Sequence, residues 1–101
     1  MDKTIFQRIM DREIPSSIVF ENEGYIAIKD INPQAPVHFL VIPKALSTRL
    51  DEITDPLELG KLYAVAVQVA RAHLKDYMLV TNVGASAGQT VFHTHIHVLG
   101  G

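Results

Sequence analysis

The sequence contains no cysteine, no run of lysines or arginines, and no long apolar stretch. The absence of cysteine excludes disulfides, thiolate metal sites and a cysteine nucleophile. A net charge of −2 without basic clusters argues against a dedicated surface for nucleic acid. No apolar segment reaches the roughly 18 residues of a membrane-spanning helix, and the N-terminal segment has no apolar signal-peptide core. We therefore expect a cytoplasmic protein with neither a nucleic-acid nor a membrane partner.

What is present indicates one small globular domain over residues 1–101. Hydrophobic residues make up 48% of the chain and charged residues 20%, which is typical of a folded domain with a single core. Apolar spacing predicts an α+β fold with a mostly antiparallel five-stranded sheet, one short N-terminal helix and one long helix. The expected helices are a segment capped by Thr4 and stopped by Pro15, and 55–74; the expected strands are 18–21, 25–30, 38–42, 77–82 and 91–99.

Three histidines alternate along the last of these strands. His93, His95 and His97 occupy every second position of the run 91–99. Side chains at i, i+2 and i+4 of a strand share one face, so the three imidazoles are expected on one surface, with Thr94 and Ile96 on the other. Such a surface would be a pocket loaded with protonatable groups.

A loop of small residues, 83–89, leads directly into the histidine strand. Gly84 and Gly88 would let backbone N–H groups approach an anion, and Ser86, Gln89 and Thr90 could add hydrogen bonds. A phosphate would suit this loop, although glycine-rich turns are commonplace. The segment has no lysine and lacks the P-loop spacing, which excludes a Walker-type nucleotide site.

The run His93-Thr94-His95-Ile96-His97-Val98-Leu99 resembles the signature of the histidine triad (HIT) superfamily. Residues 30–44 and the ending Leu99-Gly100-Gly101 resemble its HINT branch, the nucleoside phosphoramidate hydrolases. The resemblance implies a HIT-like fold, a single HIT domain over 1–101, and a homodimer. It implies no cofactor and no metal. Its substrate would be a purine nucleoside monophosphate linked to an amine.

The resemblance also implies catalytic roles. His95 would attack the α-phosphorus and form a nucleotidyl-histidine, which water then hydrolyses. A neutral imidazole is nucleophilic near neutral pH, and a covalent intermediate divides one difficult displacement into two easier steps. An amine leaves phosphorus readily only when protonated, and His97 is the candidate acid, ahead of His93. His38 would belong to the same network and orient one of the rings.

By the same resemblance, Asn82, Gln89 and Thr90 would hold oxygens of the phosphate or of the leaving group. The nucleoside side of the site would comprise Asp30 at the ribose hydroxyls and, lining the purine pocket, Phe6, Ile9 and Ile31. Simpler roles are open for some of them. Phe6 and Ile9 lie on the apolar side of the first helix, where core residues are expected, and Asp30 is an ordinary turn residue before Asn-Pro.

Other interpretations of the histidine run are a zinc site, a dinucleoside-polyphosphate hydrolase, and a non-catalytic nucleotide sensor. The outer Cα atoms of three alternating residues on a straight strand lie roughly 13 Å apart, which opposes joint coordination of one zinc ion. Residues 33–36 and the terminal glycines favour the phosphoramidate branch. Members of that branch usually continue beyond the glycines, whereas this chain ends at Gly101, so we expect a more open leaving-group side. His73 has no motif around it and is excluded from the site.

Overall fold

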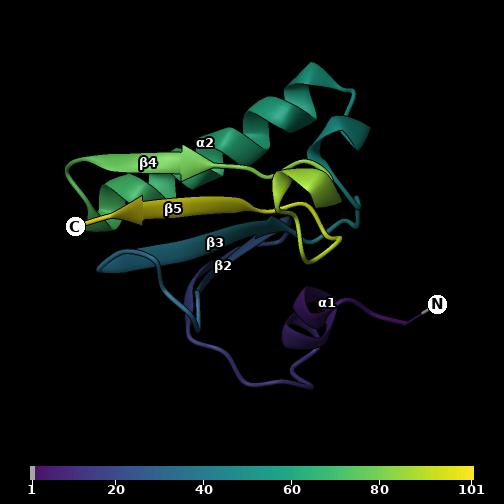
Figure 1. The fold of residues 1–101 in the computed structure, drawn as a ribbon, viewed down its shortest axis with the longest axis horizontal. Helices are drawn as coiled ribbons and strands as arrows, with labels where there is room; N and C mark the ends of the chain where they lie inside the picture. Colours follow the sequence, from purple (N-terminus) through teal and green to yellow (C-terminus); the bar gives the residue numbers. More distant parts are fainter. Residues whose placement is uncertain (1) are drawn as a thin grey trace.

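The computed structural model describes residues 2–101 and shows a five-stranded antiparallel sheet with one helix on each face (Figure 1). The strand order is β1-β2-β3-β5-β4. The elements are α1 (Ile5–Met10), β1 (Ile18–Glu21), β2 (Tyr25–Lys29), β3 (Val37–Pro43), η1 (Leu50–Glu52), α2 (Pro56–His73), β4 (Tyr77–Val80), η2 (Ala85–Ala87) and β5 (Ile96–Gly100). The α+β class, the single domain and the sheet are confirmed.

The two faces of the sheet follow the alternation of side chains along β2 and β3. Ala27 and Val41 point toward α2 and pack in a core with its apolar side, including Leu62. Ile26 and Ile42 point the other way, toward α1. Both faces of β3 are therefore covered, as its nearly continuous apolar sequence predicts. Among residues 2–101, no helix is both long and apolar enough to cross a bilayer.

Each helix begins where the sequence predicts. The Thr4 side chain accepts from the backbone N–H of Gln7, while the Gln7 side chain accepts from the Thr4 N–H, which completes a capping box. Asp55 caps α2 through the Leu57 N–H, with Pro56 in the first turn. However, α1 ends at Met10, well before Pro15, because the chain turns through a left-handed conformation at Arg12 (φ 62°).

The strand predicted over 91–99 was placed too early. β5 begins at Ile96, which pairs with Val41, and residues 91–95 are irregular. Here the backbone N–H of Thr94 donates to Ser47 O at 2.8 Å, in the segment that follows β3. β4 likewise ends at Val80 rather than at residue 82. His93 and His95 therefore lie in a connecting segment, and of the three alternating histidines only His97 lies in a strand.

Candidate active site

A pocket of about 270 Å³ opens between α1 and the sheet face that α1 covers. Its wall is mainly apolar, with a few polar groups, as expected of a ligand site. Seven of the eleven residues predicted for the site line it: Phe6, Ile9, Asp30, Ile31, Thr90, His95 and His97. Phe6 and Ile9 are also buried in the core beneath α1, so each of them both packs in the core and lines the pocket. Ile31 is 93% exposed and lies at the rim.

His95 is held in one orientation and one tautomer. Its Nδ1 lies 2.7 Å from the backbone oxygen of His93. A carbonyl oxygen can only accept, so Nδ1 carries the hydrogen and the neutral ring keeps its lone pair on Nε2. The Phe6 ring packs against the His95 ring in a T-shaped arrangement, with 5.0 Å between the ring centroids. Burial lowers the pKa of His95, which keeps the imidazole neutral and nucleophilic near neutral pH.

His97 and His38 form a directed hydrogen-bond chain behind the pocket. The backbone N–H of Gln34 donates to His38 Nδ1 at 3.0 Å, which leaves the His38 hydrogen on Nε2. His38 Nε2 lies 2.9 Å from His97 Nδ1 and donates to it. The neutral His97 ring therefore carries its own hydrogen on Nε2, available to a substrate oxygen or nitrogen. Burial lowers the pKa of His97, and nearby His95 and His38 lower it further.

His93 lies outside the pocket wall and is fully buried. Its Nε2 lies 2.7 Å from Pro43 O at the end of β3, and its Nδ1 lies 3.3 Å from the Thr4 hydroxyl. Burial lowers the pKa of His93. Both ring nitrogens thus face protein groups, and the link from His93 to the site runs through its carbonyl, which orients His95.

Asp30 combines a turn role with a place in the pocket wall. Its Oδ1 accepts from the backbone N–H of Asn32 at 2.8 Å, and its Oδ2 lies 3.4 Å from His38 Nε2. Ligand atoms of Asp30, His38 and His97 lie within 4.8 Å of one another, and we call these three residues the Asp30 cluster. Carboxylate and imidazole ligands suit a transition metal. A cation bound there would replace the proton that His38 now donates to His97.

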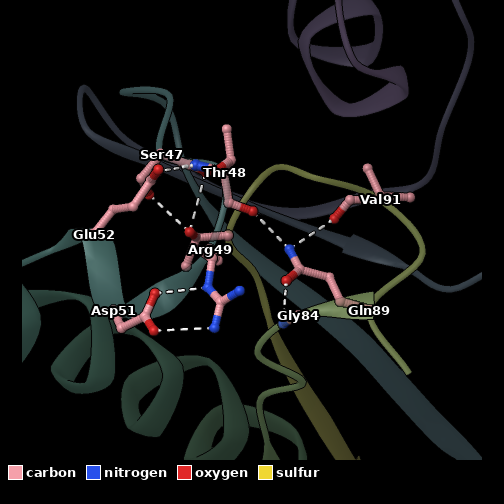
Figure 2. A network of polar contacts seen from close by, with 9 residues as sticks. Ser47, Thr48, Arg49, Asp51, Glu52, Gly84, Gln89 and Val91 are labelled. Atoms are coloured by element: carbon pink, nitrogen blue, oxygen red, sulfur yellow. Dashed lines mark hydrogen bonds and ion pairs between the residues drawn. The ribbon is translucent and has the colours of Figure 1, made fainter. Parts of the chain in front are cut away.

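The structure does not bring Asn82 and Gln89 to the pocket wall. Gln89 is 4% exposed, and its side-chain amide accepts from Gly84 N at 2.9 Å and donates to Thr48 O and Val91 O (Figure 2). The Asn82 amide donates to Ala87 O at 2.8 Å. Both amides therefore brace the loop before the triad. Thr90 is the one member of this predicted group that lines the pocket.

Sequence reasoning did not find two residues that brace the histidine segment. The sequence predicts Thr4 only as a helix cap, and the structure shows that it also contacts His93. Ser47 donates its hydroxyl to Thr94 Oγ1 at 2.7 Å and accepts the Thr94 N–H on its carbonyl. Neither residue carries a local signal for this contact, because its partner is distant in sequence. His73 is exposed and contacts Val69 O on its own helix, away from the pocket.

A connecting segment that presents a tautomerically fixed histidine, His95, to a mainly apolar pocket beside an antiparallel sheet defines a histidine-based site, and the comparisons identify its family. Residues 11–101 match the HIT domain family. The chain belongs to this family. Its relatives include uncharacterized HIT-like proteins of Synechocystis sp. (50% identical over 105 residues, covering 99% of this chain and 91% of the relative) and Synechococcus elongatus (44% over 104 residues, 99% and 91%).

Solved structures with the same fold include two HIT family hydrolases. The protein from Clostridium thermocellum is 45% identical with a TM-score of 0.91, and the alignment covers 100% of this chain and 92% of that one. The protein from Legionella pneumophila is 38% identical with a TM-score of 0.91, covering 98% and 93%. The resemblance stated from the sequence is thus confirmed at the level of the HIT family.

Proposed function

We propose that this protein hydrolyses nucleoside phosphoramidates, with His95 as the covalent nucleophile. The observation that carries the proposal is the His95 ring itself. Its Nδ1–H is committed to His93 O, so the lone pair on Nε2 is left for chemistry in a pocket that the ring lines. Depression of the pKa of His95 by burial favours the nucleophilic neutral form.

In the first step, His95 Nε2 forms a bond to the α-phosphorus while the bond from phosphorus to the amine nitrogen breaks. The departing amine takes up a proton, for which His97 in its imidazolium form is the candidate donor, because its Nε2–H is not used by the contact between His97 Nδ1 and His38. In the second step, water attacks the phosphorus, gives one proton back to His97, and the bond to His95 breaks. The products are a nucleoside monophosphate and the free amine, with both histidines returned to their starting states.

The nucleoside half of the substrate would occupy the apolar part of the same pocket. Phe6 and Ile9 form its wall and Ile31 its exposed rim, which suits a flat purine base. The Asp30 carboxylate lies at the histidine end, where it could accept hydrogen bonds from ribose hydroxyls. Thr90 offers a hydroxyl near the phosphate, whereas Asn82 and Gln89 would act by bracing the loop.

We also propose a homodimer. β4 is an edge strand of the sheet and carries Met78, an apolar residue that is 57% exposed. A second copy could cover such an edge and add buried area to a small domain. Light scattering at micromolar concentration tests this, because a mass near 11.2 kDa, that of one chain, would contradict the dimer.

The test of the proposed reaction is a comparison of substrates under metal chelation. We expect adenosine 5′-phosphoramidate to be hydrolysed with a higher kcat/KM than a diadenosine polyphosphate, with no loss of rate in EDTA. A His73→Ala variant is the matched histidine control, because His73 is exposed and distant from the pocket, and it should keep the wild-type rate. Preference for the diadenosine compound would refute the phosphoramidate assignment.

A further inference from the structure

We propose that Thr4 is a positioning residue for the reaction, because its hydroxyl holds the His93 ring and thereby fixes the direction in which His95 faces the pocket. The inference rests on the proposed function, since it concerns how the His95 nucleophile is presented. It assigns to the first residue before α1 a task beyond helix capping.

The other hydrogen bonds of Thr4 and His93 determine which of the two groups is the donor in the contact between them. His93 Nε2 lies 2.7 Å from Pro43 O, and a carbonyl oxygen accepts only, so Nε2 carries the ring hydrogen. The neutral ring then has a lone pair on Nδ1, which lies 3.3 Å from Thr4 Oγ1. The Thr4 hydroxyl already accepts from Gln7 N at 3.1 Å and is free to donate its hydrogen to His93. One hydroxyl therefore serves both contacts.

The His93 ring has no alternative to these partners. The residue is completely buried, so no solvent water reaches Nδ1 in place of the Thr4 hydroxyl. The carbonyl of the same residue accepts the His95 Nδ1–H at 2.7 Å. A shift of residue 93 would therefore move the acceptor that sets both the tautomer and the orientation of His95.

The helix that Thr4 caps also contacts both histidines. Phe6, two residues further on, packs edge-on against His93 at 6.0 Å and against His95 at 5.0 Å. Loss of the cap could thus disturb the site through Phe6 without any part for the hydroxyl hydrogen. A test must separate capping from donation to His93. The titratable neighbour whose charge acts on His93 is His95.

Three substitutions of Thr4 make this separation. Thr4→Val removes the cap and the donor; Thr4→Ser keeps both; Thr4→Asp keeps a strong N-cap acceptor but has no hydrogen to donate. Asp55→Ala is the matched control, because it removes the cap of α2, which is remote from the pocket. The readouts are kcat and KM for adenosine 5′-phosphoramidate, and ¹⁵N resonances of the histidine rings as a function of pH.

We expect Thr4→Val to lower kcat about fivefold, which corresponds to one net hydrogen bond, with KM changed by less than about twofold. Thr4→Ser should retain the wild-type kcat. Thr4→Asp should lose at least as much as Thr4→Val although α1 is capped, and His93 should take up a second proton, on Nδ1, at a higher pH than in the wild type. Asp55→Ala should lower stability and leave kcat unchanged.

Wild-type kcat and wild-type His93 resonances in Thr4→Asp would overturn the proposal, since capping would then be the whole role of Thr4. Failure of Thr4→Ser to retain activity would also overturn it. If the wild type does not hydrolyse the phosphoramidate, the proposed function fails. The ¹⁵N resonances of the histidine rings then still test whether Thr4 positions His93. Thr4→Asp, in which α1 stays capped, must then change the ring resonances of His93 and His95 while Asp55→Ala changes neither; unchanged resonances in Thr4→Asp would overturn the proposal.

Discussion

Two substitutions of His38 each keep one of its two hydrogen bonds and remove the other. In His38→Asn the amide reaches the position of the ring Nδ1 and can still accept from Gln34 N–H, but no donor faces His97. In His38→Gln the amide reaches the position of Nε2 and can donate to His97 Nδ1, while the Gln34 N–H loses its acceptor. The wild-type distances of these two contacts are 3.0 Å and 2.9 Å.

The two losses differ in cost because their surroundings differ. Gln34 is exposed, so water can replace the acceptor that its N–H loses in His38→Gln. The contact with His97 is made by the His38 side chain, which is only 3% exposed, and there an unpaired nitrogen costs about 1–2 kcal/mol. If His97 must present its Nε2–H to the substrate, that penalty corresponds to about a five- to thirtyfold lower kcat in His38→Asn. His38→Gln should lose less than about fivefold.

The assay is steady-state hydrolysis of adenosine 5′-phosphoramidate at neutral pH, with thermal melting of each variant to confirm folding. The ratio of the two kcat values removes any effect that both substitutions share, such as loss of the aromatic contact between the rings of His38 and His97. Equal rates, or a faster His38→Asn, would refute the tautomer chain derived from the Gln34 contact.

Three further predictions concern stability and inhibition. First, burial lowers the pKa of His93, His95 and His97 below the ordinary 6.5. In acid the unfolded chain therefore binds more protons than the folded protein. The free energy of unfolding, measured by urea titration, should fall as the pH drops below about 6.5. Second, Gln89→Ala should cost about 1–3 kcal/mol of stability, because the N–H of the buried Gly84 loses its acceptor and the carbonyls of Thr48 and Val91 lose a donor. Third, Zn²⁺ should inhibit hydrolysis reversibly by binding the Asp30 cluster, and Asp30→Asn should weaken that inhibition.

Each of these predictions has a result that contradicts it. Stability that stays constant between neutral pH and about pH 5 would show that the three rings are protonated in the folded state at no cost. A Gln89→Ala variant within about 0.5 kcal/mol of the wild type would remove the bracing role of the amide. Inhibition by Zn²⁺ that is equally strong in Asp30→Asn would place the cation elsewhere.

Local patterns in the sequence were sufficient for most of the fold. The apolar run of β3 predicted a strand covered on both faces, and Asp55 with Pro56 predicted the start of α2. The early start assigned to the histidine strand was wrong because period-two spacing continues through residues 91–95, while no neighbouring strand is there to pair with them. Strand pairing depends on a partner that is remote in sequence, and no local pattern reports its end.

The candidate site was predictable to a similar degree. The spacing of the histidines and the resemblance to the HIT family led to residues that line one pocket, including Asp30, His95 and His97. The role of Gln89 could not be predicted from the sequence, because a polar side chain beside a glycine-rich loop can face either a phosphate or the protein. Its donation to Thr48 O, 41 positions away along the chain, becomes visible only in the fold.

The most direct test of the central claim is a search for the covalent intermediate. Wild-type protein and His95→Ala are mixed with adenosine 5′-phosphoramidate in the presence of a chelator, quenched in the first turnovers, and examined by mass spectrometry of their peptides. The predicted result is an adenylyl group on the peptide that contains His95 in the wild type, and neither adduct nor turnover in a folded His95→Ala. Turnover by His95→Ala at a rate near that of the wild type, or an adduct on another residue, would contradict His95 as the nucleophile.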